Sequence, residues 1–170
     1  MRIRTPLGQL PASVVVAGNV AFWPAWTFVV GWIAQRTPDA QYLRENVVTR
    51  PHSIERDGDW YRVTWQIHRW KDRLPEAGAL YGGFTKRTVS AGDVATMEQF
   101  VIETRRAELA HWGMAAGVLV TTLWNPWWAA GINAGVAASS NIPCIAVQRY
   151  NRLRLGRAVD AARRRATSSR

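Results

Sequence analysis

The chain has 170 residues and a mass of 19.1 kDa, which is enough for one domain. Apolar residues make up 48% of it and charged residues 20%, but the charge is missing from two long stretches, residues 7–35 and 112–148. The second stretch is too long for a single core helix. These features exclude an ordinary soluble globular protein and indicate a small membrane protein.

The net charge of +10 is concentrated at the C-terminal end of the chain. Residues 149–170 contain eight arginines and one aspartate. Positive charge beside a membrane segment stays cytoplasmic, and it attracts anionic lipid headgroups. Because no nucleic-acid-binding motif accompanies the charge, we expect a basic cytoplasmic tail and no nucleic-acid partner.

The first apolar segment follows an N-terminal cap of residues 1–11. Residues 12–34 carry no charge and can cross the ~30 Å hydrocarbon layer of a bilayer. A cleaved signal peptide would have a shorter apolar core and a small-residue cleavage site before Gln35, which is missing here. We therefore predict an uncleaved signal-anchor helix, kinked at Pro24.

Residues 35–92 form a polar region that is rich in aromatic side chains. Between Trp60 and Trp70, apolar and basic residues are interleaved with a spacing that suits either a strand or a helix. Beside a membrane we favour an amphipathic interfacial helix, with the aromatic side chains in the lipid and the basic ones at the phosphates.

Residues 93–148 are expected to form an amphipathic helix, capped by Asp93, that runs into a transmembrane helical hairpin with its turn at residues 125–126. The apolar part before the turn, residues 112–123, gives only ~18 Å of helix. To span a membrane the helix must extend further back, which brings residues 108–111 to membrane depth. Pro143 should break the second helix.

The predicted fold is thus an all-α membrane protein with an N-terminal signal-anchor helix, an interfacial amphipathic middle region and a C-terminal transmembrane hairpin. The hairpin places the middle region on the same side as the basic tail of residues 149–170. The N-terminus then lies outside despite Arg2 and Arg4, or the first segment re-enters on the same side.

Ionisable residues at membrane depth are candidates for a functional site. Counting outward from the turn places His111 level with about Ser140 and Glu108 level with about Pro143, beside the polar run of residues 139–141. Glu108 precedes His111 by three residues on one helix face, so it can hold the imidazole tautomer while the other ring nitrogen takes a proton from a hydroxyl. The alternative is structural, with His111 hydrogen-bonded across the hairpin to Asn141 or a serine.

The sequence gives little support for a metal site or for the histidine–aspartate box of a known acyltransferase class. The single cysteine, Cys144, excludes an internal disulfide and a cysteine-cluster metal site. One copy of Glu-x-x-His is too few for a carboxylate metal site, so we expect no metal and no bound cofactor. His68 and Asp72 are one residue short of the His-x4-Asp box of glycerolipid acyltransferases.

Three blocks of the chain, residues 70–78, 103–112 and 141–155, resemble the glycosyl-4,4'-diaponeurosporenoate acyltransferase family of staphyloxanthin-type carotenoid biosynthesis. The similarity covers residues 31–155. It implies a multi-pass enzyme of the bacterial cell membrane that transfers a fatty acyl group to a sugar hydroxyl of a glycosylated carotenoid or related glycolipid. The acyl donor would be acyl-CoA or acyl carrier protein.

From their spacing and their depth in the membrane we expect His111 and Glu108 to be catalytic, with His111 deprotonating the sugar hydroxyl that attacks an acyl thioester. The expected substrate-binding residues lie in the second and third blocks: Glu103, Arg105, Arg106, Ser140, Asn141, Gln148, Arg149 and Asn151. The three arginines would bind phosphates of the donor, and Ser140 or Asn141 would stabilise the oxyanion. The alternative function is a non-catalytic membrane scaffold of lipid or carotenoid metabolism.

Overall fold

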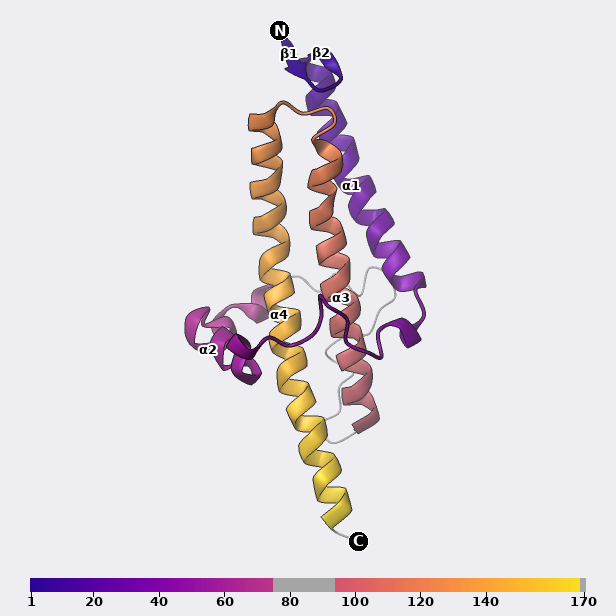
Figure 1. The fold of residues 1–170 in the computed structure, drawn as a ribbon, viewed down its shortest axis with the longest axis vertical. Coiled ribbons are helices and arrows are strands. Elements are labelled where there is room, and N and C mark those ends of the chain that lie inside the picture. The colour runs from indigo at the N-terminus through magenta and orange to yellow at the C-terminus, as the bar shows by residue number, and fades with distance from the viewer. Residues whose placement is uncertain (75–93, 169–170) are drawn as a thin grey trace.

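The computed structural model describes residues 1–74 and 94–168, and most of these residues are helical (Figure 1). Three long helices lie side by side: α1 (Ala12–Arg36), α3 (Val94–Thr121) and α4 (Trp127–Ser168). The antiparallel pair α3 and α4 forms the most extensive contact, and α1 packs on α3. The expected helix cap at Asp93 and residues 75–78 of the first family-like block lie outside the described residues.

The chain reverses direction at residues 122–126, which contain the turn expected at residues 125–126. The Asn125 backbone N–H and side-chain amide both donate to the Thr121 carbonyl, at 3.1 and 2.9 Å, and so close the end of α3. The predicted break at Pro143 is wrong, since α4 continues through it. A single proline removes one backbone donor, and the flanking turns packed on α3 keep the helix continuous.

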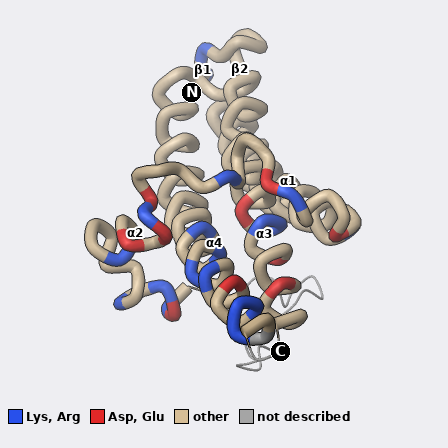
Figure 2. The backbone as a smooth tube through the Cα atoms, turned by 60° about the horizontal axis from the view of Figure 1, so that its bottom comes forward, with Lys and Arg blue, Asp and Glu red and all other residues tan. Residues whose placement is uncertain are grey.

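Two segments are long and apolar enough to cross a membrane, Ala12–Arg36 and Trp127–Arg165. In the most apolar window of α1 only 11% of the residues are buried inside the protein, so its apolar side chains face outward. Figure 2 shows that the charged residues gather at the opposite end from most of this apolar surface. Helix α3 carries charged residues along its first half, as far as Glu108. From His111 to its end at Thr121 it has no acidic, lysine or arginine side chain.

Polar side chains join the three helices at their apolar end. Asn19 and Asn125 exchange side-chain hydrogen bonds at 2.8 and 2.9 Å. The indole of Trp23 donates to Asn133 Oδ1 at 2.7 Å, and that of Trp26 to the Gly113 carbonyl at 3.1 Å. These directional bonds fix the register of the three apolar helix ends, which hydrophobic contact alone does not specify.

The expectation of an all-α chain is wrong at the N-terminus. Strands β1 (Arg2–Thr5) and β2 (Gly8–Pro11) form an antiparallel hairpin, and α1 begins directly after it. Gly8 has a φ of +105°, which an L side chain rarely adopts, and Thr5 Oγ1 donates to its carbonyl at 3.0 Å. Strands of four residues are too short to show a clear alternation in the sequence.

The continuous amphipathic helix predicted for residues 60–70 is also wrong. Helix α2 (Asp59–Thr64) ends before Gln66, whose φ of +47° breaks the helix. Three short 3-10 turns lie before and after it in the chain: η2 (Ser53–Gly58), η3 (Ile67–Arg69) and η4 (Lys71–Arg73). A fourth, η1 (Asp39–Gln41), follows α1 and lies beside α3, where Asp39 pairs with Arg106.

The aromatic side chains of this middle region pack against α4. Tyr61 and Ile67 are buried with Ala146, Val147 and Tyr150 of α4, and three tryptophans lie against this cluster. Burying these aromatic surfaces against a helix outweighs the local preference for a regular helix. Residues 53–74 of the middle region therefore form a cap on α4 that is built from short turns.

A side chain at Gly117 should weaken the packing of α1 on α3. A Cβ at Gly117 would lie 2.6 Å from the Trp26 indole nitrogen, whereas one at Gly135 would meet nothing within 4 Å. We expect Gly117→Ala to destabilise the protein by about 1–3 kcal/mol through overpacking, measured by thermal unfolding in detergent. Gly135→Ala is the matched control, and equal effects of the two variants would contradict this packing.

Candidate functional site

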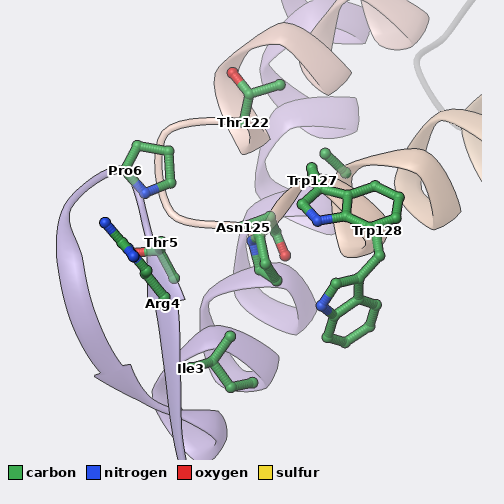
Figure 3. Close-up of a pocket in the computed structure, with 10 residues that line it drawn as sticks. Ile3, Arg4, Thr5, Pro6, Thr122, Asn125, Trp127 and Trp128 are labelled. Carbon is green, nitrogen blue, oxygen red and sulfur yellow. The ribbon is translucent and has the colours of Figure 1, made fainter.

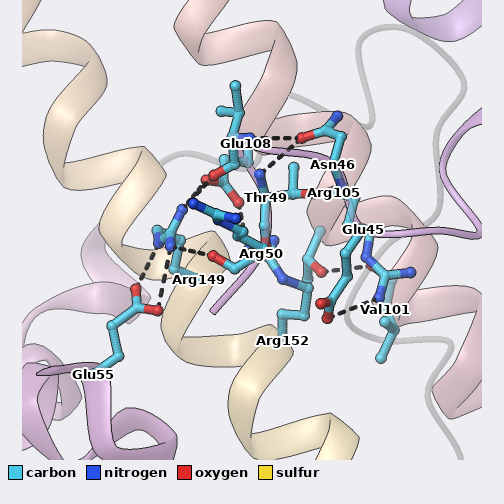
Figure 4. Close-up of polar contacts among 12 residues, drawn as sticks. Glu45, Asn46, Thr49, Arg50, Glu55, Val101, Arg105, Glu108, Arg149 and Arg152 are labelled. Carbon is cyan, nitrogen blue, oxygen red and sulfur yellow. Dashed lines mark hydrogen bonds and ion pairs between the residues drawn. The ribbon is translucent and has the colours of Figure 1, made fainter. Parts of the chain in front are cut away.

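The most deeply buried charge in the described structure belongs to Glu108, which is 0% exposed. Its Oε1 accepts from Arg149 Nη1 at 2.5 Å, and its Oε2 lies 2.6 Å from Arg152 Nη2 (Figure 4). Both arginines are buried and lie on α4. Because helical side chains tilt toward the N-terminus of their own helix, side chains of the antiparallel helices α3 and α4 point toward each other and meet.

Arg149 also ties the middle region to the helices. Its guanidinium pairs with both oxygens of Glu55, at 2.6 and 3.2 Å. It further donates to the carbonyls of Val48 and Arg50, and Arg152 donates to that of Thr49, all at 2.8–2.9 Å. The segment of residues 48–55 is thereby fixed across α4 (Figure 4).

Glu55 completes this buried cluster. It accepts from the Tyr61 hydroxyl and from the His52 backbone N–H, each at 2.6 Å. Burial alone would raise the pKa of the Glu55 carboxyl, but the hydrogen bonds from Arg149, Tyr61 and His52 outweigh it and hold the pKa below its ordinary value. Burial and the nearby carboxylate raise the pKa of the Tyr61 hydroxyl, which stays protonated as a donor.

Arg106 closes the C-terminal end of α1. Its Nη1 donates to the carbonyls of Ala34 and Thr37 at 2.9 and 3.1 Å, and its Nη2 pairs with Asp39. Glu103 lies 3.2 Å from its Nε. A guanidinium is well suited to this place, because the last carbonyls of a helix have no helical partner and carry partial negative charge.

Arg105 holds the chain just beyond this helix end. Its Nη1 donates to the carbonyls of Tyr42 and Leu43 at 3.0 and 2.8 Å, and its Nη2 lies 3.5 Å from Glu45. The three arginines expected to bind donor phosphates, Arg105, Arg106 and Arg149, are thus all occupied by partners within this chain.

His111 pairs with Asn141 across the α3–α4 interface, with Nδ1 and Oδ1 3.0 Å apart. The Asn141 amide nitrogen donates to the Ala137 carbonyl at 2.9 Å, so its oxygen is the atom that faces the imidazole. An oxygen can only accept, so Nδ1 must carry the proton. In a neutral imidazole the other ring nitrogen, Nε2, is then the one that can accept a proton.

The expected pairing of Glu108 with His111 is replaced by other partners in the structure. Both carboxylate oxygens of Glu108 face the guanidinium groups of Arg149 and Arg152, and Asn141 holds the imidazole nitrogen. A catalytic role for Glu108 and His111 stays a prediction. In the structure the His111 tautomer is fixed by the Asn141 amide, whereas the sequence predicted the Glu108 carboxylate in this role.

The remaining predicted residues have different surroundings. The side chain of Ser140 is exposed, although it neighbours Asn141 in sequence. Gln148 and Asn151 are half-buried on α4, and neither has a side-chain hydrogen bond to another part of the described chain. Together with Ser140, whose hydroxyl also has no partner among the described residues, they are the substrate-binding candidates whose polar groups are not already occupied.

Sequence reasoning missed two members of the buried cluster, Arg152 and Glu55. Arg152 follows Arg149 by three residues on the same face of α4, and this spacing was a usable signal. Glu55 gives no local signal, because only the path of the middle region brings it to α4. His68 and Asp72, the near match to the His-x4-Asp box, do not hydrogen-bond to each other in the structure. The side chain of His68 is exposed, and Asp72 pairs with Lys71 at 2.7 Å.

No metal site is evident in the described part of the chain. Within residues 1–74 and 94–168, no three histidine, cysteine or acidic side chains are grouped so that they could hold a metal ion.

A pocket of about 770 Å³ lies at the opposite end of the molecule, between the β-hairpin and the α3–α4 connection (Figure 3). Arg4, Trp127 and Trp128 are among its lining residues. From Trp128 to Asn141 there are 13 residues of helix, or ~20 Å. The pocket is therefore remote from the His111–Asn141 pair.

The family model of glycosyl-4,4'-diaponeurosporenoate acyltransferases matches residues 40–161 of the chain. A protein named glycosyl-4,4'-diaponeurosporenoate acyltransferase from Staphylococcus aureus (strain MRSA252) is 26% identical over 147 residues, which cover 85% of this chain and 87% of that protein. One of the same name from Staphylococcus haemolyticus (strain JCSC1435) is 29% identical over 136 residues, or 79% of each chain. No solved structure matches this chain.

Removing the charge of Glu108 should destabilise the protein strongly. Glu108→Gln leaves Arg152 without its carboxylate and Arg149 with only one, and breaking a buried pair in this way costs about 3–5 kcal/mol. Glu98→Gln breaks the exposed pair with Arg163 and should cost less than about 1 kcal/mol. Chemical unfolding in detergent measures both, and a Glu108→Gln variant as stable as Glu98→Gln would contradict a structural role for the cluster.

Acid should weaken the attachment of the middle region through Glu55. Its pKa in the folded chain is lower than the ordinary value of 4.5, so its stabilising contribution is complete above that value and is lost as the pH falls through the lower folded-state pKa. We expect the melting temperature to fall more steeply between about pH 5 and pH 3 in the natural chain than in Glu55→Gln. Parallel slopes for the two proteins would refute this assignment.

Proposed function

Because this chain belongs to the glycosyl-4,4'-diaponeurosporenoate acyltransferase family, we propose that it transfers a fatty acyl group to a sugar hydroxyl of a glycosylated carotenoid or related glycolipid. It is an acyltransferase of that family. The observation that supports our proposal for its chemistry is the His111–Asn141 pair, in which the amide oxygen faces Nδ1 and leaves Nε2 as the ring nitrogen that can take a proton from a substrate.

We infer a location in the bacterial cell membrane with several crossings. Two helices can span a bilayer, and many of their large apolar side chains are exposed, Val20, Phe28 and Ile132 among them. The charged end, with the arginine-rich part of α4, then lies in the cytoplasm. His111 lies about one turn beyond Arg106, which caps the end of α1, so it sits just inside the polar boundary.

In the proposed mechanism, His111 Nε2 takes the proton of the sugar hydroxyl as its oxygen attacks the thioester carbonyl of the acyl donor. A new ester C–O bond forms, the C–S bond breaks, and the departing thiolate receives the proton from the imidazolium. Asn141 Oδ1 accepts from Nδ1 throughout and stabilises the imidazolium. The Ser140 hydroxyl is the neighbouring donor that we assign to the oxyanion.

We assign substrate contacts and scaffolding to different residues of the two family-like blocks. Gln148 and Asn151 are proposed to bind the sugar, because their amides have no hydrogen-bond partners elsewhere in the described chain. The donor is acyl-CoA or acyl carrier protein. Arg105, Arg106 and Arg149 are proposed to position the middle region, since a guanidinium already held by carbonyls and carboxylates has few donors left for a phosphate.

A non-catalytic scaffold is the second candidate, and the same contacts support it. A hydrogen bond between His111 and Asn141 joins α3 to α4 whether or not a proton is transferred. The two functions differ in one measurable way: loss of a structural contact lowers the amount of folded protein, whereas loss of a base lowers turnover.

The decisive experiment is lipid and pigment mass spectrometry in cells that lack the gene, complemented with the natural chain or with His111→Ala. We expect a non-acylated glycolipid to accumulate and His111→Ala to lower acyl transfer by about 100-fold or more, at an unchanged protein level. Asn141→Ala, which frees the imidazole, should cause a smaller loss of transfer.

His52→Ala, which removes an exposed histidine of the middle region, is the matched control and should restore the acylated product fully. If cells with His111→Ala acylate the glycolipid as fully as cells with the natural chain, His111 is not the catalytic base. A lipid and pigment profile unchanged by the deletion would support the scaffold instead.

A further inference from the structure

The pocket of about 770 Å³ between the β-hairpin and the α3–α4 connection has no part in the proposed chemistry (Figure 3). Arg4 of β1 is one of its lining residues, and Trp127 and Trp128 at the start of α4 are two others. Arg4 is exposed, and the two tryptophans are 86% and 48% exposed. All three side chains are therefore accessible to a ligand from outside the protein.

The pocket lies about one bilayer thickness from the charged end of the molecule. On α1, Ala34, whose carbonyl accepts from Arg106, follows Ala12 by ~33 Å of helix. On α4, Arg149 follows Trp127 by the same ~33 Å. The hydrocarbon layer of a bilayer is ~30 Å thick. With the charged end at one polar boundary, the pocket is level with the headgroups of the opposite leaflet.

This end of the molecule has positive charge and no acidic side chain of its own. Asp39 is the first acidic residue of the chain, and none lies between Glu108 and Asp160. The β-hairpin, the start of α1 and the α3–α4 connection therefore contain no carboxylate side chain. Neither Arg2 nor Arg4 makes an ion pair within the part of the chain that the structure describes. The counter-charge of Arg4 thus comes from outside the described chain.

Trp127 and Trp128 add hydrogen-bond donors to this cationic pocket. Neither indole nitrogen has a partner among the described residues, whereas those of Trp23 and Trp26 donate to groups between the helices. Tryptophan is suited to the boundary of a membrane, because its ring contacts apolar chains while its N–H reaches polar groups.

An exposed apolar face of α4 begins at the pocket itself. Trp128, Ile132 and Val136 follow at steps of four residues, so Ile132 and Val136 lie on the same face, ~6 and ~12 Å from Trp128 along the helix. They are 60% and 56% exposed. A Cβ at Gly131 or Gly135 would meet nothing within 4 Å, so the surface beside them is open. A lipid headgroup in the pocket has room for its acyl chains directly below it.

We propose that this pocket binds the phosphate of an anionic phospholipid from the leaflet opposite the charged end, with the acyl chains along Ile132 and Val136. The inference rests on the membrane location given under the proposed function. Arg4 suits a phosphate because the planar donors of a guanidinium match two phosphate oxygens. A zwitterionic lipid fits less well, because its ammonium group adds positive charge beside Arg2 and Arg4. An uncharged sugar lipid leaves Arg4 without a counter-charge.

The phospholipid is a bound partner and not a reactant. Trp128 and Asn141 are separated by ~20 Å of α4, so a phosphate in the pocket does not reach His111. Its effect is on the fold. Arg4 and Trp128 belong to elements far apart in the sequence, and a headgroup that contacts both joins the β-hairpin to the start of α4.

The test is native mass spectrometry of the full chain in detergent, titrated with phosphatidylglycerol, phosphatidylcholine or an uncharged glucosyl diacylglycerol. We expect the natural chain to bind phosphatidylglycerol most tightly. Arg4→Gln should bind it about 10-fold more weakly, through the loss of charge-assisted hydrogen bonds. Arg2→Gln is the matched control, since it removes the same charge from the same strand but from a residue outside the pocket lining. It should weaken binding by less than about threefold, because salt screens an exposed charge.

The proposal is wrong if Arg4→Gln binds phosphatidylglycerol as tightly as the natural chain does. It is also wrong if Arg2→Gln loses as much affinity, which would show diffuse attraction to the hairpin, or if either of the other lipids binds equally well. Displacement by inorganic phosphate at equal concentration would show an anion site that does not use the acyl chains. His111→Ala should lose acyl transfer and keep the lipid, whereas Arg4→Gln should keep transfer, so each proposal can fail without the other.

Discussion

The arrangement of this protein depends on the cost of burying the Glu108 carboxylate on a helix beside two apolar partners. An isolated charge would be very unfavourable there, so the chain must bring compensating charge to it. Arg149 and Arg152 provide that charge from α4, and each also donates to backbone carbonyls of residues 48–50. A single buried carboxylate thus links the register of α3 and α4 to the path of the middle region.

Two ends of the molecule are held by different forces. At the charged end, arginines bind carboxylates and the free carbonyls of α1, as Arg106 does at Ala34. At the apolar end, amide and indole groups make a small number of hydrogen bonds, such as the reciprocal pair of Asn19 and Asn125. His111 and Asn141 pair across the α3–α4 interface between these two ends. This intermediate position is the one that we propose for the acyl-transfer site.

Arginines in the sequence blocks that resemble the family can have a structural role beside residues proposed to bind substrate. In the sequence, Arg105, Arg106 and Arg149 stand beside long uncharged segments, and this position alone suggests phosphate binding. In the folded chain their donors are used internally, whereas Arg157, further along α4, has no side-chain hydrogen bond or ion pair among the described residues. The availability of a guanidinium to a ligand depends on its neighbours, which no local pattern reveals.

The sequence by itself determined the apolar helices, the reversal at residues 122–126 and the closeness of His111 to Asn141, because helix length and a short turn fix which residues are level. It also led to the family. Tertiary structure alone decided that Asn141, and not Glu108, holds the imidazole, and that Glu55 reaches Arg149. It also replaced a regular interfacial helix with short turns packed on α4. These outcomes depend on side-chain direction and on a long-range chain path, and neither is encoded in the spacing of nearby residues.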